Sequence, residues 1–95
     1  MAVVIVDGEN VRRSLWPNMS RDELEARANA WAGREGHDVR VVWDADSPRG
    51  YADDEIVRLA AELEPPVWVV TSDRGLRERL DVERTLGGGS FARTI

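Results

Sequence analysis

The sequence predicts an α/β fold: a three-layer α/β/α sandwich around a central, mostly parallel sheet of the Rossmann-like kind. Three short runs of β-branched and aromatic residues each end in an aspartate, and helical segments separate the runs. This alternation is typical of βαβ units with right-handed crossovers. The first run is apolar throughout, as in a strand covered by helices on both faces. The 95 residues fit one domain, residues 1–95.

The first half of the chain predicts two strands and two helices. Pro17 ends the first helix, because proline is poorly tolerated inside a helix. Ser20 and Glu23 form a capping box at the start of the second helix, and Gly36 follows its end. In order, we expect a strand at 2–6, a helix at 10–15, a helix from 21 to 32 or 35, and a strand at 39–43.

The second half continues the alternation. A helix that starts near Asp53 carries an apolar stripe, and Pro65 and Pro66 stop it. After the next strand, Ser72 or Asp73 caps a short helix. We expect this strand at 67–71 and the short helix at 74–80, followed by a strand at 82–86 and a terminal helix from residue 90.

Composition excludes several classes of protein. The absence of cysteine excludes disulfide frameworks and thiolate metal sites. No segment approaches the roughly 20 apolar residues of a membrane span, and the start does not resemble a signal peptide. We therefore expect a soluble, cytoplasmic protein with no membrane partner. The formal net charge of −5 argues against nonspecific nucleic-acid binding, but it is compatible with a nuclease whose carboxylates hold a metal ion.

Aspartates mark the carboxyl ends of all three predicted strands. Asp7, Asp44 and Asp73 end the runs, and Asp53 opens the helix after the second strand. Because the carboxyl ends of parallel strands share one edge, these side chains should meet there. Two carboxylates about 4 Å apart repel by roughly 4 kcal/mol at an effective dielectric near 20. The pattern therefore predicts one or two hard cations, Mg²⁺ or Mn²⁺, with Asn10 nearby to orient a ligand or water.

Helix capping is the alternative explanation for each of these aspartates. An aspartate directly after a strand often accepts hydrogen bonds from the first amides of a helix. Capping is the better explanation for any single one, whereas four at the same edge favour a metal site. We expect capping to leave Asp44 unexplained, because a loop with Ser47 and Pro48 follows it rather than a helix.

Five short motifs occur in order between residue 3 and about residue 80: Asp7-Gly8-Glu9-Asn10-Val11, Ser14-Leu15-Trp16-Pro17, Val41-Val42-Trp43-Asp44, Ala52-Asp53-Asp54-Glu55-Ile56 and Val69-Val70-Thr71-Ser72-Asp73-Arg74. Together they resemble the motifs of NYN domains, the PIN-like ribonucleases, and in particular the YacP-type branch. The resemblance implies a PIN-like fold and metal-dependent hydrolysis of RNA, with Mg²⁺ or Mn²⁺ as cofactor.

The same resemblance implies roles for individual residues. Asp7, Asp53 and Asp73 would form the catalytic, metal-binding core, with Asp44 as a further metal ligand. Asn10 would act beside them in catalysis. Ser72 would support the cluster.

The sequence departs from the family pattern in three places. Glu9 adds a negative charge beside Asp7, Tyr51 stands where threonine is common, and the segment between Asp46 and Asp53 is short. These departures affect substrate binding more than the acidic cluster. They favour, as the alternative hypothesis, a catalytically weak or inactive RNA-associated or regulatory module.

Arginines close to the motifs are the candidates for RNA binding. The residues expected to contact phosphates are Arg12, Arg49 and Arg74. We expect Arg13 and Arg77 to be ordinary surface charge. Trp16 is expected to pack over the neighbouring helix rather than stack on a base, and His37 to be solvated.

A third class of function is another magnesium-dependent phosphoryl-transfer enzyme. A receiver-type phosphoacceptor needs a lysine, and the chain has none. A Toprim-like domain could use Asp44-Ala45-Asp46, but it needs a glutamate where Asp7 stands. The sequence leaves open which RNA is the substrate, whether one or two ions bind, and whether the protein forms a homodimer.

Overall fold

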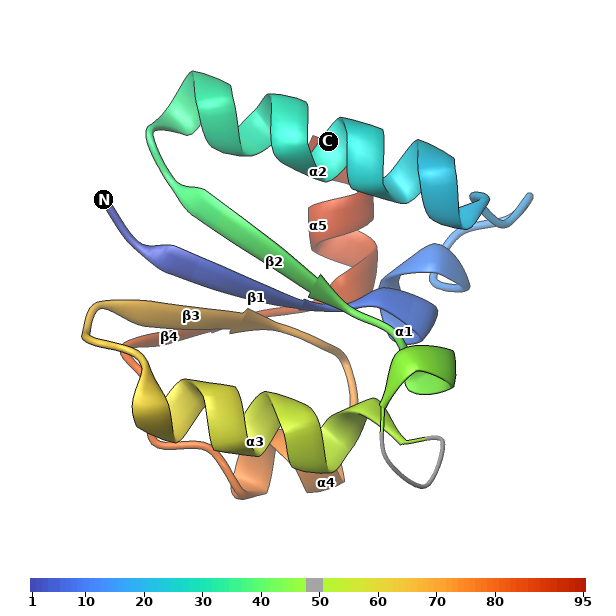
Figure 1. Ribbon diagram of the computed structural model, residues 1–95. Coiled ribbons are helices and arrows are strands. Elements are labelled where there is room, and N and C mark those ends of the chain that lie inside the picture. Colours follow the sequence, from blue (N-terminus) through green and yellow to red (C-terminus); the bar gives the residue numbers. More distant parts are fainter. Residues whose placement is uncertain (48–50) are drawn as a thin grey trace.

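The computed structural model describes residues 1–47 and 51–95, so Arg49 lies outside the described residues. Its four-stranded sheet is parallel throughout, in the order β2-β1-β3-β4 (Figure 1). The strands are β1 (Val3–Asp7), β2 (Asp38–Val42), β3 (Val67–Val70) and β4 (Arg84–Leu86). The helices are α1 (Gly8–Arg12), α2 (Arg21–Glu35), the 3₁₀ turn η1 (Asp44–Asp46), α3 (Ala52–Glu62), α4 (Arg74–Glu78) and α5 (Gly88–Thr94). Within the described ranges, none of the helices has both the length and the apolar character needed to cross a membrane.

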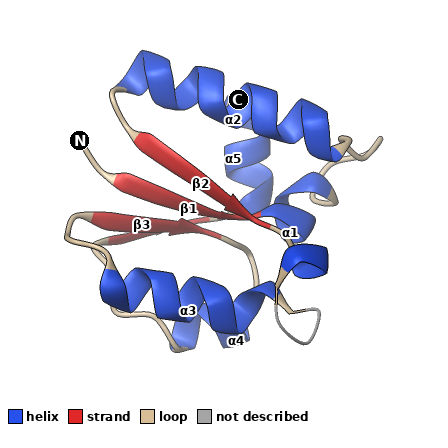
Figure 2. Ribbon diagram, viewed as in Figure 1, coloured by secondary structure: helices blue, strands red, loops and turns tan. Residues whose placement is uncertain are grey.

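Helices cover both faces of the sheet, which confirms the three-layer sandwich (Figure 2). Val4 and Val6 of β1 face one layer, where they share a core with Leu24 of α2 and Phe91 of α5. Ile5 faces the opposite layer and packs in the core formed with α3 and α4. Because successive side chains of a strand point to opposite faces, β1 is apolar at each position from Val3 to Val6.

Ser20 and Gly36 delimit α2 as the sequence predicts. The Ser20 hydroxyl accepts a hydrogen bond from the backbone N–H of Glu23 at 3.1 Å. Gly36 ends the helix with a φ of 73°, a left-handed conformation that glycine adopts without a Cβ clash. The Glu23 carboxylate pairs with Arg27, 2.9 Å away in the next turn. The cap by Ser20 is therefore confirmed, whereas the Glu23 side chain forms an ion pair on the surface of the helix.

The first helix begins two residues earlier than predicted, at a residue that lies close to a distant part of the chain. α1 starts at Gly8, where a Cβ atom would lie 2.6 Å from Cε3 of Trp43. Only glycine lets the turn after β1 pass this close to the indole ring. α5 also begins early, at Gly88 rather than Ser90.

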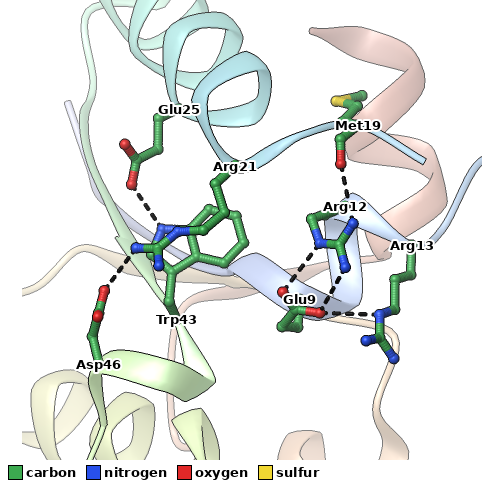
Figure 3. Close-up of polar contacts among 8 residues, drawn as sticks. All are labelled: Glu9, Arg12, Arg13, Met19, Arg21, Glu25, Trp43 and Asp46. Atoms are coloured by element: carbon green, nitrogen blue, oxygen red, sulfur yellow. Dashed lines mark hydrogen bonds and ion pairs between the residues drawn. The ribbon is translucent and has the colours of Figure 1, made fainter.

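Trp43 in turn fixes the segment that follows β2 (Figure 3). Its Nε1 donates a hydrogen bond to Oε1 of Glu25 at 2.7 Å. The guanidinium of Arg21 lies 4.7 Å from the ring centroid and donates to Oδ2 of Asp46 at 2.7 Å. These contacts tie η1 to α2, so the position of Asp44 is set by a buried side chain on one side and an ion pair on the other.

His37 is half-buried against two aromatic rings, so the prediction that it is simply solvated is wrong. Its ring centroid lies 4.6 Å from that of Trp68 and 5.4 Å from that of Trp31. Its Nδ1 accepts a hydrogen bond from the backbone N–H of Ala2 at 3.0 Å. The pattern of the sequence did not show that aromatic rings from α2 and β3 would meet at this loop.

The strand order determines where a site can form. From β1 the chain passes to β2 on one side, and then crosses to β3 on the other side of β1. The connections after β1 and β3 therefore diverge, and a crevice opens between the carboxyl ends of these two strands. Open α/β sheets bind their ligands at such a switch point.

Candidate active site

A cleft of about 610 Å³ opens at the carboxyl ends of the strands. The four aspartates predicted to converge all line it: Asp7, Asp44, Asp53 and Asp73. The other lining residues are Glu9, Asn10, Arg13, Ser14, Ser72 and Gly89. The structure thus brings the predicted acidic residues together, although they lie on four different segments of the chain.

Asp7 is buried at the floor of the cleft, with 5% of its surface exposed. It occupies the N-cap position of α1, but its side chain makes no capping hydrogen bond. Instead its Oδ2 accepts a hydrogen bond from the hydroxyl of Thr71 at 2.8 Å. Capping therefore does not explain this carboxylate.

The surroundings of Asp7 raise its pKa from 3.8 to about 6. Burial is the main cause, because it penalises the charged form. The hydrogen bond from Thr71 opposes this shift, and the charges of Asp53, Asp44 and Asp73 add to it. The pKa of Asp53, half-exposed in the first turn of α3, is also raised, first by burial and then by Asp73 and Asp44, with Arg79 opposing.

Asp44 and Asp73 each use one carboxylate oxygen to cap a helix. Oδ1 of Asp73 accepts from the backbone N–H of Leu76 at the start of α4, at 3.0 Å. Oδ1 of Asp44 accepts from the backbone N–H of Ala52, at the start of α3, at 2.9 Å. The expectation that capping would leave Asp44 unexplained is therefore wrong, since this aspartate caps a helix eight residues further on. Their Oδ2 atoms make no hydrogen bond within the described residues.

Asn10 and Ser72 connect three segments at the wall of the cleft. Oδ1 of Asn10 accepts from the backbone N–H of Ser72 at 2.9 Å. The Ser72 hydroxyl accepts from the backbone N–H of Gly88 at 2.8 Å. A Cβ at Gly88 would lie 2.5 Å from Oδ1 of Asn10, so glycine is required for this approach. The two side chains hold α1, the end of β3 and α5 together, which is a supporting arrangement.

Of the arginines predicted to bind RNA, neither Arg12 nor Arg74 lines the cleft. Arg12 donates to Glu9 and to the backbone carbonyl of Met19 (Figure 3), and it does not line the cleft. Arg74 is exposed at the start of α4, also outside the lining. Arg13, expected to be ordinary surface charge, does line the cleft.

Thr71 and Arg13 are two residues of the site that the sequence did not predict. Thr71 is fully buried; its hydroxyl donates to Asp7 and accepts from the backbone N–H of Asp73 at 3.1 Å. A polar residue directly after a buried strand was a usable signal for Thr71. For Arg13 the sequence carried none, because Arg12 and Arg13 are neighbours and only the turn of α1 decides which one faces the cleft.

The donor set fits a hard divalent cation by its chemistry. Carboxylates from separate segments share the cleft, and their mutual repulsion contributes to the raised pKa of Asp7. Among the described residues, no three acidic or histidine side chains lie close enough to bind one ion directly. Mg²⁺ usually keeps several waters and takes one or two carboxylates. The arrangement therefore suits an ion held by one or two of the aspartates and, through water, by the others.

Comparison with known proteins does not assign a family. No protein-family model, curated protein or solved structure matches the chain. Function is therefore inferred from the geometry of the cleft and from the motifs of the sequence.

Proposed function

We propose that the protein is a divalent-metal-dependent endoribonuclease of the NYN or PIN-like type, which hydrolyses phosphodiester bonds in RNA with Mg²⁺ or Mn²⁺. The proposal rests on the environment of the Asp7 carboxylate. This carboxylate is buried, caps no helix, and has a pKa raised to about 6 beside three other acidic side chains. The shift from 3.8 corresponds to at most about 3 kcal/mol against the ionised form in the folded protein. A bound cation would offset that cost.

The residues of the cleft take distinct roles in this proposal. Asp7, Asp53 and Asp73 hold the ion, directly or through water, and Asp44 contributes its second oxygen. When bound, Mg²⁺ or Mn²⁺ lowers the pKa of water and neutralises charge on a phosphoryl group. Asn10 keeps its side-chain NH₂ for the substrate or a water, because its Oδ1 is already used by Ser72.

RNA as the substrate is supported by the five motifs that resemble NYN domains. A cytoplasmic location is part of the same proposal. A homodimer would be recognised by its mass in solution.

The proposal is tested by RNA cleavage. Wild type should cut single-stranded or hairpin RNA in Mn²⁺ or Mg²⁺, and EDTA should abolish cleavage. Asp7→Asn should lose most of the activity, whereas Asp81→Asn, which removes the same charge from an exposed position, should keep it. Equal cleavage by wild type and Asp7→Asn would exclude the mechanism.

A second candidate is an RNA-associated module with little or no catalysis. It is favoured by the lining of the cleft, in which Arg13 is the one basic side chain among the described residues. Such a module would still bind Mn²⁺ and gain stability, by about 2.7 kcal/mol at a hundred times the dissociation constant. A rise in Tm with Mn²⁺ and no cleavage of any RNA would select this candidate.

A further inference from the structure

We propose that Arg13 and Trp16 form a subsite at the rim of the cleft for one nucleotide of single-stranded RNA, with the phosphate on Arg13 and the base on Trp16. This inference rests on the proposed function and specifies how the substrate is held. It concerns residues outside the acidic cluster, neither of which was predicted to bind RNA.

Arg13 is placed to receive a phosphate. It lines the cleft, and 66% of its side chain is exposed. Its Nε forms an ion pair with Oε2 of Glu9 at 3.0 Å (Figure 3). Its two terminal nitrogens, Nη1 and Nη2, make no hydrogen bond or ion pair with the described residues. A guanidinium can use such a pair of nitrogens for two parallel hydrogen bonds to one phosphate.

Glu9 holds Arg13 in place because it is itself anchored. Arg12 donates from Nε to Oε1 of Glu9 at 3.1 Å and from Nη2 to Oε2 at 3.3 Å. Nη1 of Arg12 donates to the backbone carbonyl of Met19 at 3.3 Å. The hydrogen bonds from Arg12 lower the pKa of Glu9, so this carboxylate stays charged. The extra acidic residue beside Asp7 therefore acts as a positioning group for an arginine.

Trp16 presents an indole ring to solvent three residues later. It is 88% exposed, so the prediction that it packs over the neighbouring helix is wrong. The other tryptophans lie in the core or pack against it: Trp31, Trp43 and Trp68. Three residues of extended chain span at most about 11 Å, which keeps Trp16 close to Arg13.

The loop that carries Trp16 is tied down at both ends. The backbone N–H and the hydroxyl of Ser14 both donate to the carbonyl of Val11, at 3.1 and 2.6 Å. At the far end the backbone N–H of Met19 donates to the carbonyl of Arg12 at 3.2 Å, and the Met19 side chain is buried in the core. A large apolar ring on a loop anchored in this way is not explained by packing.

Single-stranded RNA fits this pair of residues better than other polyanions do. An aromatic face binds a base only where the base is unstacked, as in single strands, loops and ends. A phosphate contact next to such a face matches the repeat of phosphate and base along one strand. The net charge of −5 gives little general attraction for nucleic acid, so a stacking contact would carry a large share of the affinity.

The test measures binding separately from cleavage. The dissociation constant of a fluorescein-labelled single-stranded RNA is measured by anisotropy in EDTA. The measurement starts at low salt and is repeated at increasing salt concentrations. Arg13→Ala should weaken binding roughly tenfold and make the slope of log K against log salt shallower by about 0.7, as expected for one lost phosphate contact. Trp16→Ala should weaken binding roughly tenfold with the slope unchanged, and Trp16→Phe should restore most of the affinity.

Two controls make the result decisive. Arg34→Ala removes an exposed arginine from the last turn of α2 and should leave affinity within twofold of wild type. All variants should unfold at the wild-type temperature, since both side chains are exposed. Unchanged affinity in Arg13→Ala and Trp16→Ala, no RNA binding by wild type, or equal losses in Arg34→Ala would each overturn the subsite. If the variants lose binding but no RNA is ever cut in Mn²⁺, the subsite stands and the nuclease proposal fails.

Discussion

Replacing Asp7 by asparagine should raise the free energy of unfolding at neutral pH. The pKa of Asp7 is 3.8 in a model peptide and about 6 in the folded protein. Each pKa unit corresponds to about 1.4 kcal/mol, so ionised Asp7 disfavours the folded state by up to about 3 kcal/mol. Water in the open cleft screens part of this penalty, which makes the figure an upper limit.

The sign of the pH dependence follows from proton binding. Below pH 3.8 the carboxyl is neutral in both states and carries no penalty. Between 3.8 and about 6 the folded protein binds more protons than the unfolded chain, so the contribution of Asp7 to stability falls as pH rises. Above about pH 6 the whole penalty is present. Wild type should therefore lose stability across this window, relative to a variant that has no titratable group at position 7.

Asparagine keeps the fold of the site while removing the charge. Its side-chain carbonyl can accept the hydrogen bond that Thr71 donates to Asp7, and its NH₂ group can contact water in the cleft. We expect Asp7→Asn to be more stable than wild type by about 1–3 kcal/mol at about pH 7.5. In a domain of this size, each kcal/mol raises Tm by roughly 4–8 °C. At about pH 4 the two proteins should be almost equally stable.

Thermal or urea unfolding followed by circular dichroism measures this difference. Asp81→Asn serves as the control, because it removes one charge at an exposed position and should show no such window. Mn²⁺ should stabilise wild type more than Asp7→Asn, since the ion offsets a charge that the variant lacks. A variant less stable than wild type at about pH 7.5, or a difference independent of pH, would show that the burial of Asp7 is not a cost and would remove the main support for the metal site.

Two further substitutions test how the site is positioned. Gly8→Ala should destabilise the protein by about 1–3 kcal/mol in urea unfolding, because the new Cβ would meet the ring of Trp43 at 2.6 Å. The control is Gly33→Ala, which has no atom within 4 Å of its Cβ and should be neutral or slightly stabilising. Equal effects of the two substitutions on stability would exclude the clash. Thr71→Val should cost about 1–3 kcal/mol and raise the pKa of Asp7 further, because it removes the one hydrogen bond that lowers that pKa. The loss of stability with rising pH should then extend above pH 6, and an unchanged window in pH-dependent unfolding would contradict the role of Thr71.

The features of the fold that depend on local sequence pattern were predicted correctly. An apolar run marks β1 because its neighbours bury both of its faces, and Ser20 and Gly36 mark α2 because caps are local chemistry. The convergence of the aspartates also followed, since parallel strands place their carboxyl ends at one edge. What could not be predicted depends on contacts between distant segments. Gly8, at the start of α1, passes close to the ring of Trp43, which follows β2, and no periodicity in the sequence encodes that approach.

The structure distinguishes the roles of the aspartates, which the sequence alone could not do. Asp44 and Asp73 are each explained in part by the helix they cap, and removing either would expose a helix start as well as alter the cleft. Asp7 has no such duty, since its side chain caps nothing and its charge is a cost to folding. The hydrogen bond that it accepts from Thr71 does not require a charged group, so the charge needs a different explanation. The proposed cation would account for the charge, burial and neighbours of Asp7, and this makes position 7 the place where the proposed function is most open to refutation.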